Sequence, residues 1–220
     1  MPVFKSIVNI YLRGKMRKAT KTVAKVTGVT AGLAGIEHGV FEILQKGKHA
    51  PSLMFASTGA PCDPAVSWNA CEPAMSIISD FLIMGIISIA LGISISIWST
   101  FFLDRKGGGW FTILLSILLL LFGGGFFPPI IGLISGFSAS SIQKQISQRK
   151  LNGFNRLMTK IWPWPLVYFS IWSFGQFLLG YFFNDFLKTN MLFFTLLFMV
   201  MLGFAIITAN AQDRKLEYLK

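Results

Sequence analysis

Residues 110–137 read WFTILLSILLLLFGGGFFPPIIGLISGF, and the interruption in this stretch decides how the chain folds. The stretch carries no charged residue, as expected of a segment inside a bilayer. It is interrupted by three glycines and two prolines: Gly123, Gly124, Gly125, Pro128 and Pro129. Proline removes a backbone donor and clashes with the preceding turn, so a regular helix cannot pass through this motif. An unbroken helix would also run about 42 Å, against a hydrocarbon core of about 30 Å. We predict a broken or re-entrant segment that folds back at the Gly-Pro motif.

The composition of the whole chain is that of a membrane protein. Of its 220 residues, 53% are hydrophobic and only 13% are charged, against roughly 25% charged residues in soluble domains. Phenylalanine occurs 22 times and the mean hydropathy is +0.61. These values exclude a disordered chain, a coiled coil and an ordinary soluble enzyme domain. We predict an all-α, polytopic membrane helix bundle with four to five spanning segments.

Other apolar and polar stretches divide the chain into regions. Residues 1–25 are basic and amphipathic, which predicts a helix on the cytoplasmic membrane surface. Residues 26–210 form one predicted transmembrane domain, and 211–220 a cytoplasmic tail. Within this domain the expected spans besides 110–137 are 26–44, 77–103, 161–183 and 191–209, joined by a Pro-rich loop at 45–75, a basic segment at 138–160 and a turn at 184–190. No cleavable signal peptide is visible, so we expect the N-terminal segment to be retained.

The distribution of positive charge sets the expected topology. The net charge is +11, from 20 Lys and Arg against 9 Asp and Glu. No known nucleic-acid module accompanies this charge, so we read it through the positive-inside rule. If every apolar stretch crossed once, the Lys and Arg would divide evenly between the two sides.

Two topologies restore the bias. In the first, 110–137 returns to the side from which it enters, and only Lys46, Lys48 and Lys188 lie outside. In the second, 26–44 does not cross and 110–137 crosses once. The broken motif favours the first. Both predict a multi-pass plasma-membrane protein with cytoplasmic N- and C-termini.

Two stripes of small residues predict close helix packing. At 100° per residue, the small residues of 26–44 fall within about 60°, and those of 77–103 within about 80°. The stripes consist of Gly28, Gly32, Gly35 and Gly39, and of Gly85, Ser88, Gly92, Ser96 and Ser99. Such seams let helix backbones approach closely. We expect the two stretches to dock antiparallel against each other.

Ionisable residues in or beside these spans form a candidate polar intramembrane site: Glu37, His38, Glu42 and Asp80. His38 and Glu42 are four residues apart and share a helical face, whereas Glu37 points the opposite way. Charges inside a bilayer are costly and often mark a functional site. This site would bind a proton, a metal or a cationic ligand. The alternative is local pairing near the interface, with Asp80 as an acid at a helix start.

Catalytic and redox motifs are sparse. Cys62 and Cys71 could close a disulfide across the 45–75 loop, or remain free thiols. They do not form a C-x-x-C motif and are too few for a zinc site. The sequence also lacks the motifs of nucleophilic serine enzymes, metalloproteases and phosphate-binding loops. We predict no cofactor and no metal, and we favour a protein that is not an enzyme.

A resemblance rests on four short motifs. These are GIEHG at 35–39, FEILQ at 41–45, EPAM at 72–75 and the GGG…PP break at 123–129. Over roughly 26–137, the chain resembles a group of small prokaryotic integral membrane proteins to which no activity is assigned. The resemblance implies a fold of four to five spans and no activity.

Two functional hypotheses follow from these observations. The first is a non-enzymatic accessory or packing subunit, which would associate with the lipid bilayer and with other membrane subunits or copies of itself. The two small-residue seams motivate this hypothesis. The alternative is a small transporter or channel with a polar intramembrane site near Glu37, His38 and Glu42. A thiol-redox enzyme using Cys62 and Cys71 is a third reading.

Overall fold

The chain is built almost entirely of helices, as predicted. The computed structural model describes residues 17–56, 72–144 and 152–218. The helices are α2 (Lys18–Leu44), α3 (Phe81–Phe101), α4 (Gly108–Leu121), α5 (Phe127–Ala139), α6 (Gly153–Ile161), α7 (Trp164–Phe182) and α8 (Asn184–Tyr218). Two short antiparallel strands, β1 (Met54–Ala56) and β2 (Pro73–Met75), pair in the loop after α2. Two helices are long and apolar enough to cross a bilayer: α3, with a mean hydropathy of 2.3, and α8, with 2.5 over 184–216.

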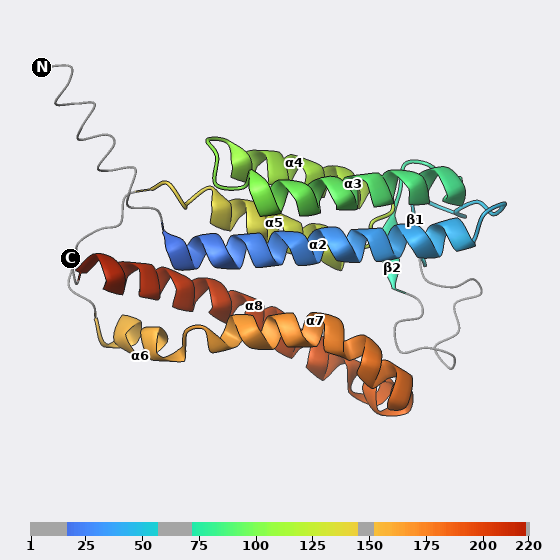
Figure 1. Ribbon diagram of the computed structural model, residues 1–220. Coiled ribbons are helices and arrows are strands. Elements are labelled where there is room, and N and C mark those ends of the chain that lie inside the picture. Colours follow the sequence, from blue (N-terminus) through green and yellow to red (C-terminus); the bar gives the residue numbers. More distant parts are fainter. Residues whose placement is uncertain (1–16, 57–71, 145–151, 219–220) are drawn as a thin grey trace, which may run out of the picture.

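The helices form two layers (Figure 1). In one layer α2 lies beside α3, α4 and α5, and in the other α7 and α8 lie side by side with α6 at one end. The layers meet where the start of α2 lies close to the end of α8. They diverge toward the end of α2 and the start of α8. A core of small and large apolar side chains joins them, including Val23, Ile131 and Phe169.

The two small-residue stripes lie directly against each other, which brings the backbones of α2 and α3 together. A Cβ atom placed on Gly92 would lie 2.5 Å from the carbonyl oxygen of Gly32, and one on Gly39 would lie 2.6 Å from that of Gly85. Further along, Gly28 contacts the Ser99 hydroxyl. Backbone atoms cannot yield as side-chain ends can, so this packing requires small residues at these positions.

The stretch 110–137 folds back on itself. Helix α4 ends at Leu121, and α5 begins at Phe127 with its two prolines in the first turn, where the missing N–H donors cost no helical bond. Between them Gly123 and Gly125 have φ of 92° and 72°, which other residues adopt only with strain. A Cβ on Gly109, at the start of α4, would lie 2.5 Å from the Gly136 carbonyl near the end of α5. The two ends of this stretch are therefore side by side.

Charged groups tie the elements together at the end where α2 begins. Asp213 of α8 accepts hydrogen bonds from the backbone N–H groups of Ala19 and Thr20, each at 2.9 Å, and from the Thr20 hydroxyl at 2.7 Å. The carboxylate of α8 thus caps α2 from outside that helix. Nearby, Lys21 donates a hydrogen bond to Asp104 in the turn after α3, which lowers the pKa of that carboxyl.

Several predicted boundaries are wrong. Residues 18–25 belong to α2 instead of a separate surface segment, and only residues 1–16 of that segment lie outside the described chain. The predicted turn at 184–190 is the start of α8, because Phe183 alone separates α7 from α8. The predicted tail is also helical up to Tyr218, since Asp213 anchors it to α2.

The α2–α3 contact predicts a strong dependence on side-chain size. Gly92→Ala should lower the free energy of unfolding by about 1–3 kcal/mol, because the added methyl group meets backbone atoms of α2. Gly203→Ala is the matched control, since a Cβ added to that helical glycine of α8 would have no atom within 4 Å. It should be neutral or slightly stabilising. Thermal unfolding in mild detergent measures both, and equal effects would contradict the packing argument.

The cap that Asp213 of α8 forms on α2 predicts a second loss of stability. Asp213→Asn removes one acceptor oxygen and the negative charge that faces the start of α2, so it should destabilise the protein by about 1–2 kcal/mol. Asp185→Asn provides the control, because the Asp185 side chain on the same helix is 93% exposed. Hydrogen exchange of the first turn of α2 should accelerate only in the Asp213 variant. Unchanged exchange there would show that the cap is dispensable.

Candidate functional site

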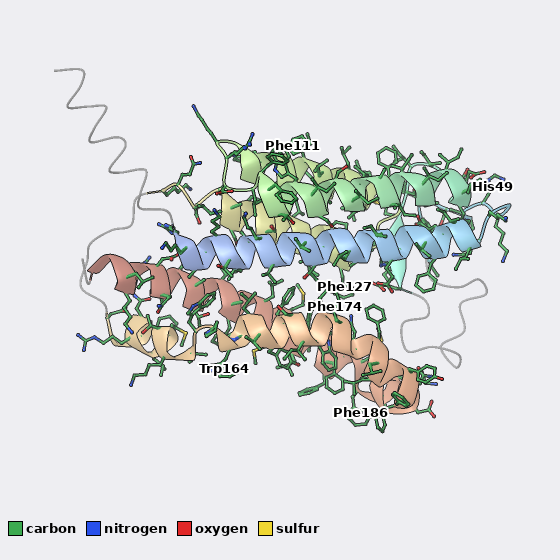
Figure 2. The ribbon with its side chains drawn as sticks, in the orientation of Figure 1. His49, Phe111, Phe127, Trp164, Phe174 and Phe186 are labelled. Carbon is green, nitrogen blue, oxygen red and sulfur yellow. The ribbon has the colours of Figure 1, made fainter. Side chains whose placement is uncertain are left out.

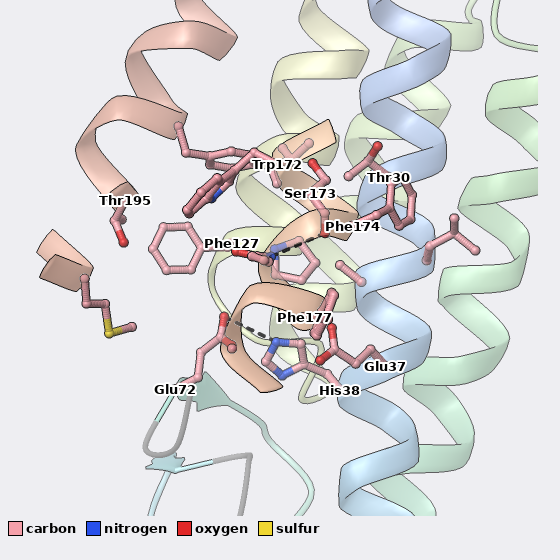
Figure 3. A pocket seen from close by; sticks show the side chains of 18 of the residues that line it. Thr30, Glu37, His38, Glu72, Phe127, Trp172, Ser173, Phe174, Phe177 and Thr195 are labelled. Atoms are coloured by element: carbon pink, nitrogen blue, oxygen red, sulfur yellow. Dashed lines mark hydrogen bonds and ion pairs between the residues drawn. The ribbon is translucent and has the colours of Figure 1, made fainter. Parts of the chain in front are cut away.

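A cavity of about 800 Å³ lies between the two layers, where they diverge (Figure 3). One wall comes from α2 and the start of α5, and the other from α7 and α8. Figure 2 shows Phe127 of α5 and Phe174 of α7 in the space between the layers. The cavity volume falls in the range of sites that enclose drug-sized ligands, about 300–1,000 Å³.

Three ionisable side chains gather on one side of this cavity. Glu37 and His38 come from α2, and Glu72 comes from the residue before β2. His38 Nε2 lies 3.4 Å from Glu72 Oε1, and the imidazole is almost fully buried. Adjacent helical residues point about 100° apart, so Glu37 reaches the cavity from the flank nearer α7 while His38 lies against the α4–α5 break. Two carboxyl groups and one imidazole therefore face the cavity from this side.

The opposite wall is aromatic. It includes Trp172, Phe174 and Phe177 of α7 and Phe198 of α8, with Phe127 of α5 beside them. Stacking between the two helices orders this wall: the Trp172 and Phe194 rings are 4.6 Å apart, and those of Phe169 and Phe198 are 4.8 Å apart. No Lys or Arg is among the described residues that line the cavity. Carboxylates facing aromatic rings attract organic cations, by charge and by cation–π contact.

The glycine break supports the ionisable residues of α2 from behind. A Cβ on Gly125 would collide with the His38 ring, and one on Gly123 would collide with a Glu42 oxygen. Both side chains therefore lie directly on the backbone of the break. Glu42 is fully buried here and is not part of the cavity lining. The break itself is held in place by β2, since Gly123 donates its N–H to the Met75 carbonyl at 3.0 Å.

The structure brings together some of the predicted site residues and separates another. Glu37 and His38 line the cavity and Glu42 lies one turn away, but Asp80 does not join them. Instead Asp80 caps α3 by accepting a hydrogen bond from the Ile83 N–H at 3.0 Å. Cys62 and Cys71 lie outside the described residues, so their pairing stays a prediction. Among the described residues, including Glu37, His38 and Glu72, no group of three or more His, Cys, Asp or Glu side chains has an arrangement that could hold a metal ion.

Sequence reasoning missed Glu72 and the aromatic wall. Glu72 lies in a Pro-rich loop far from α2 in the sequence, and no sequence pattern indicates that its carboxylate would contact His38. The aromatic residues of α7 carry no such signal in the sequence, because periodicity alone cannot tell a cavity wall from a lipid contact. The one available signal was Gln176, a polar side chain within the apolar α7, which also lines the cavity.

Comparison with known proteins adds no relative to these observations. No protein-family model, curated protein or solved structure matches this chain. The geometry of the site therefore carries the functional argument alone.

Proposed function

We propose that this chain is a multi-pass plasma-membrane protein that binds an organic cation in the cavity between its two helix layers and carries it across the membrane. The observation that carries the proposal is the acidic side of the cavity, with Glu37 and Glu72, opposite an aromatic wall that includes Trp172. In a bilayer such carboxylates are costly, so their placement around a cavity indicates ligand binding.

The proposed topology has four crossings, α2, α3, α7 and α8, and a re-entrant hairpin made of α4 and α5. At 1.5 Å per residue, the 14 residues of α4 and the 13 of α5 each reach only about 20 Å, too short to cross a core of about 30 Å. The positive-inside rule supports a cytoplasmic location for the start of α2 and the end of α8, because Lys46 and Lys48 follow the end of α2 and Lys188 lies in the first turns of α8.

The hypothesis of an accessory subunit rested on the two small-residue seams. In the structure these seams pack against each other within one chain, at contacts such as Gly32 with Gly92. A partner subunit would have to dock on a different face. The outward-facing aromatic residues, such as Trp164 and Phe186 in Figure 2, suit lipid equally well. The transporter hypothesis is therefore the one with a specific structural basis.

The topology is tested by thiol labelling in intact cells. Single cysteines are introduced as Lys46→Cys or Lys106→Cys in a background with Cys62→Ser and Cys71→Ser. A membrane-impermeant maleimide should label the cysteine at 46 in intact cells, and the one at 106 only after permeabilisation. The reversed pattern would mean either that α2 does not cross or that the whole arrangement is inverted, and in both cases it would overturn the proposed topology.

Ligand binding is tested with tetraphenylphosphonium, a bulky organic cation, and tetraphenylborate, an anion of the same shape. The purified full chain in mild detergent should bind the cation and discriminate against the anion. Glu37→Gln and Glu72→Gln should each weaken binding about tenfold or more, the equivalent of about 1.4 kcal/mol. Asp185→Asn, an exposed acid, is the control.

Transport is then measured as uptake of the same cation into proteoliposomes, where Glu37→Gln should abolish uptake while leaving the protein folded. Equal binding of cation and anion would refute the proposed cation preference. Binding without uptake would reduce the function to that of a receptor or storage site.

A further inference from the structure

Glu42 has an environment that the cavity does not explain. The side chain is fully buried, and neither carboxylate oxygen has a hydrogen-bond partner among the described residues. Glu42 and Met84 of α3 both pack against Gly123 of the break, so closely that a Cβ on Gly123 would collide with the Glu42 Oε1 atom. A buried carboxylate without a donor or counter-ion is strongly disfavoured, so Glu42 at this position either carries a proton or pairs with a cation.

The nearest polar group, the Ser88 hydroxyl, cannot supply this partner. Ser88 is fully buried and lies beside the Glu42 carboxylate. Its single proton is donated to the carbonyl of Phe122 at 2.7 Å. A hydroxyl has one donor and two lone pairs, so with its proton committed it presents only lone pairs to Glu42. An ionised Glu42 and Ser88 would therefore be two acceptors facing each other, and either a proton on Glu42 or a bound cation has to lie between them.

The helix break supplies a third oxygen at the same place. Phe122 follows the last residue of α4, so its carbonyl is outside the regular helical hydrogen-bond pattern. Broken helices in membranes use such carbonyls to coordinate small cations. Carboxylate, hydroxyl and carbonyl oxygens thus converge from three elements: α2, α3 and the break.

We propose that Glu42, Ser88 and the Phe122 carbonyl form an occluded binding site for a small monovalent metal cation of the sodium class. All three ligands are hard oxygen donors, which excludes a preference for soft metals. One carboxylate balances one positive charge, whereas divalent ions favour sites with more carboxylates. His38, one helical turn before Glu42, lies over Gly125 and belongs to the cavity lining. This site is separate from the organic-cation cavity and does not depend on it.

The test uses the purified full chain in mild detergent, without any organic ligand, in N-methyl-D-glucamine chloride at constant ionic strength. Exchange of this bulky cation for Na⁺, Li⁺ or K⁺ should raise the unfolding midpoint saturably for at least one ion, by roughly 3 °C or more at saturation. Direct binding of radioactive ²²Na⁺ gives a second readout that does not depend on unfolding.

Matched variants locate the effect. Glu42→Gln and Ser88→Ala should abolish both the ion-dependent shift and ²²Na⁺ binding. Ser94→Ala and Asp185→Asn should retain them, because Ser94 is an exposed serine of the same helix and Asp185 an exposed acid. Failure of the wild-type protein to respond to any of the three ions would overturn the proposal, as would an equal response in Glu42→Gln. If Glu42→Gln were simply more stable and the wild type indifferent to cations, Glu42 would be a neutral acid instead of a ligand.

Discussion

The contact between the backbones of α2 and α3 is the constraint on which the rest of the structure depends. Glycines at 32, 39, 85 and 92 let the two helices touch without intervening side chains. This contact fixes the rotation of α2 about its own axis. With the glycine face turned to α3, His38 and Glu42 must lie over the α4–α5 break, and Glu37 must face α7 and α8. The polar residues of α2 are therefore divided between two environments by the packing of its smallest residues.

Local sequence patterns located much of the first layer. The glycine spacing indicated which faces of α2 and α3 would meet, and the Gly-Pro motif indicated where 110–137 would turn back. The cavity was beyond such reasoning, because its walls come from residues as far apart as Thr30 and Phe198. Helical periodicity reports which residues share a face but not which distant helix covers that face. Asp80, in contrast, could be predicted from the sequence, because its role as a helix cap depends only on neighbouring residues. A helix-start acid was one of the two interpretations that the sequence allowed for it.

The two layers are held together by different kinds of contact, which matters for a cavity between them. Glycine and serine contacts leave α2–α5 little freedom, since backbone meets backbone at several points. The α7–α8 pair is joined to α2 mainly near the termini, through the apolar core and Asp213. The cavity lies toward the other end, where the layers diverge. Movement of α7 and α8 about their attached end would change the size of the cavity and leave the Glu42 environment intact.

The cap on α2 has a consequence for the order of assembly. Asp213 and Thr20 are 193 positions apart in the chain. At about 5–20 residues per second, a ribosome needs roughly ten seconds or more to synthesise the intervening segment. Until then the first N–H groups of α2 must be satisfied by other partners such as water. Helix α8 thus completes α2, and a nascent chain that stalls before Asp213 leaves α2 without its cap.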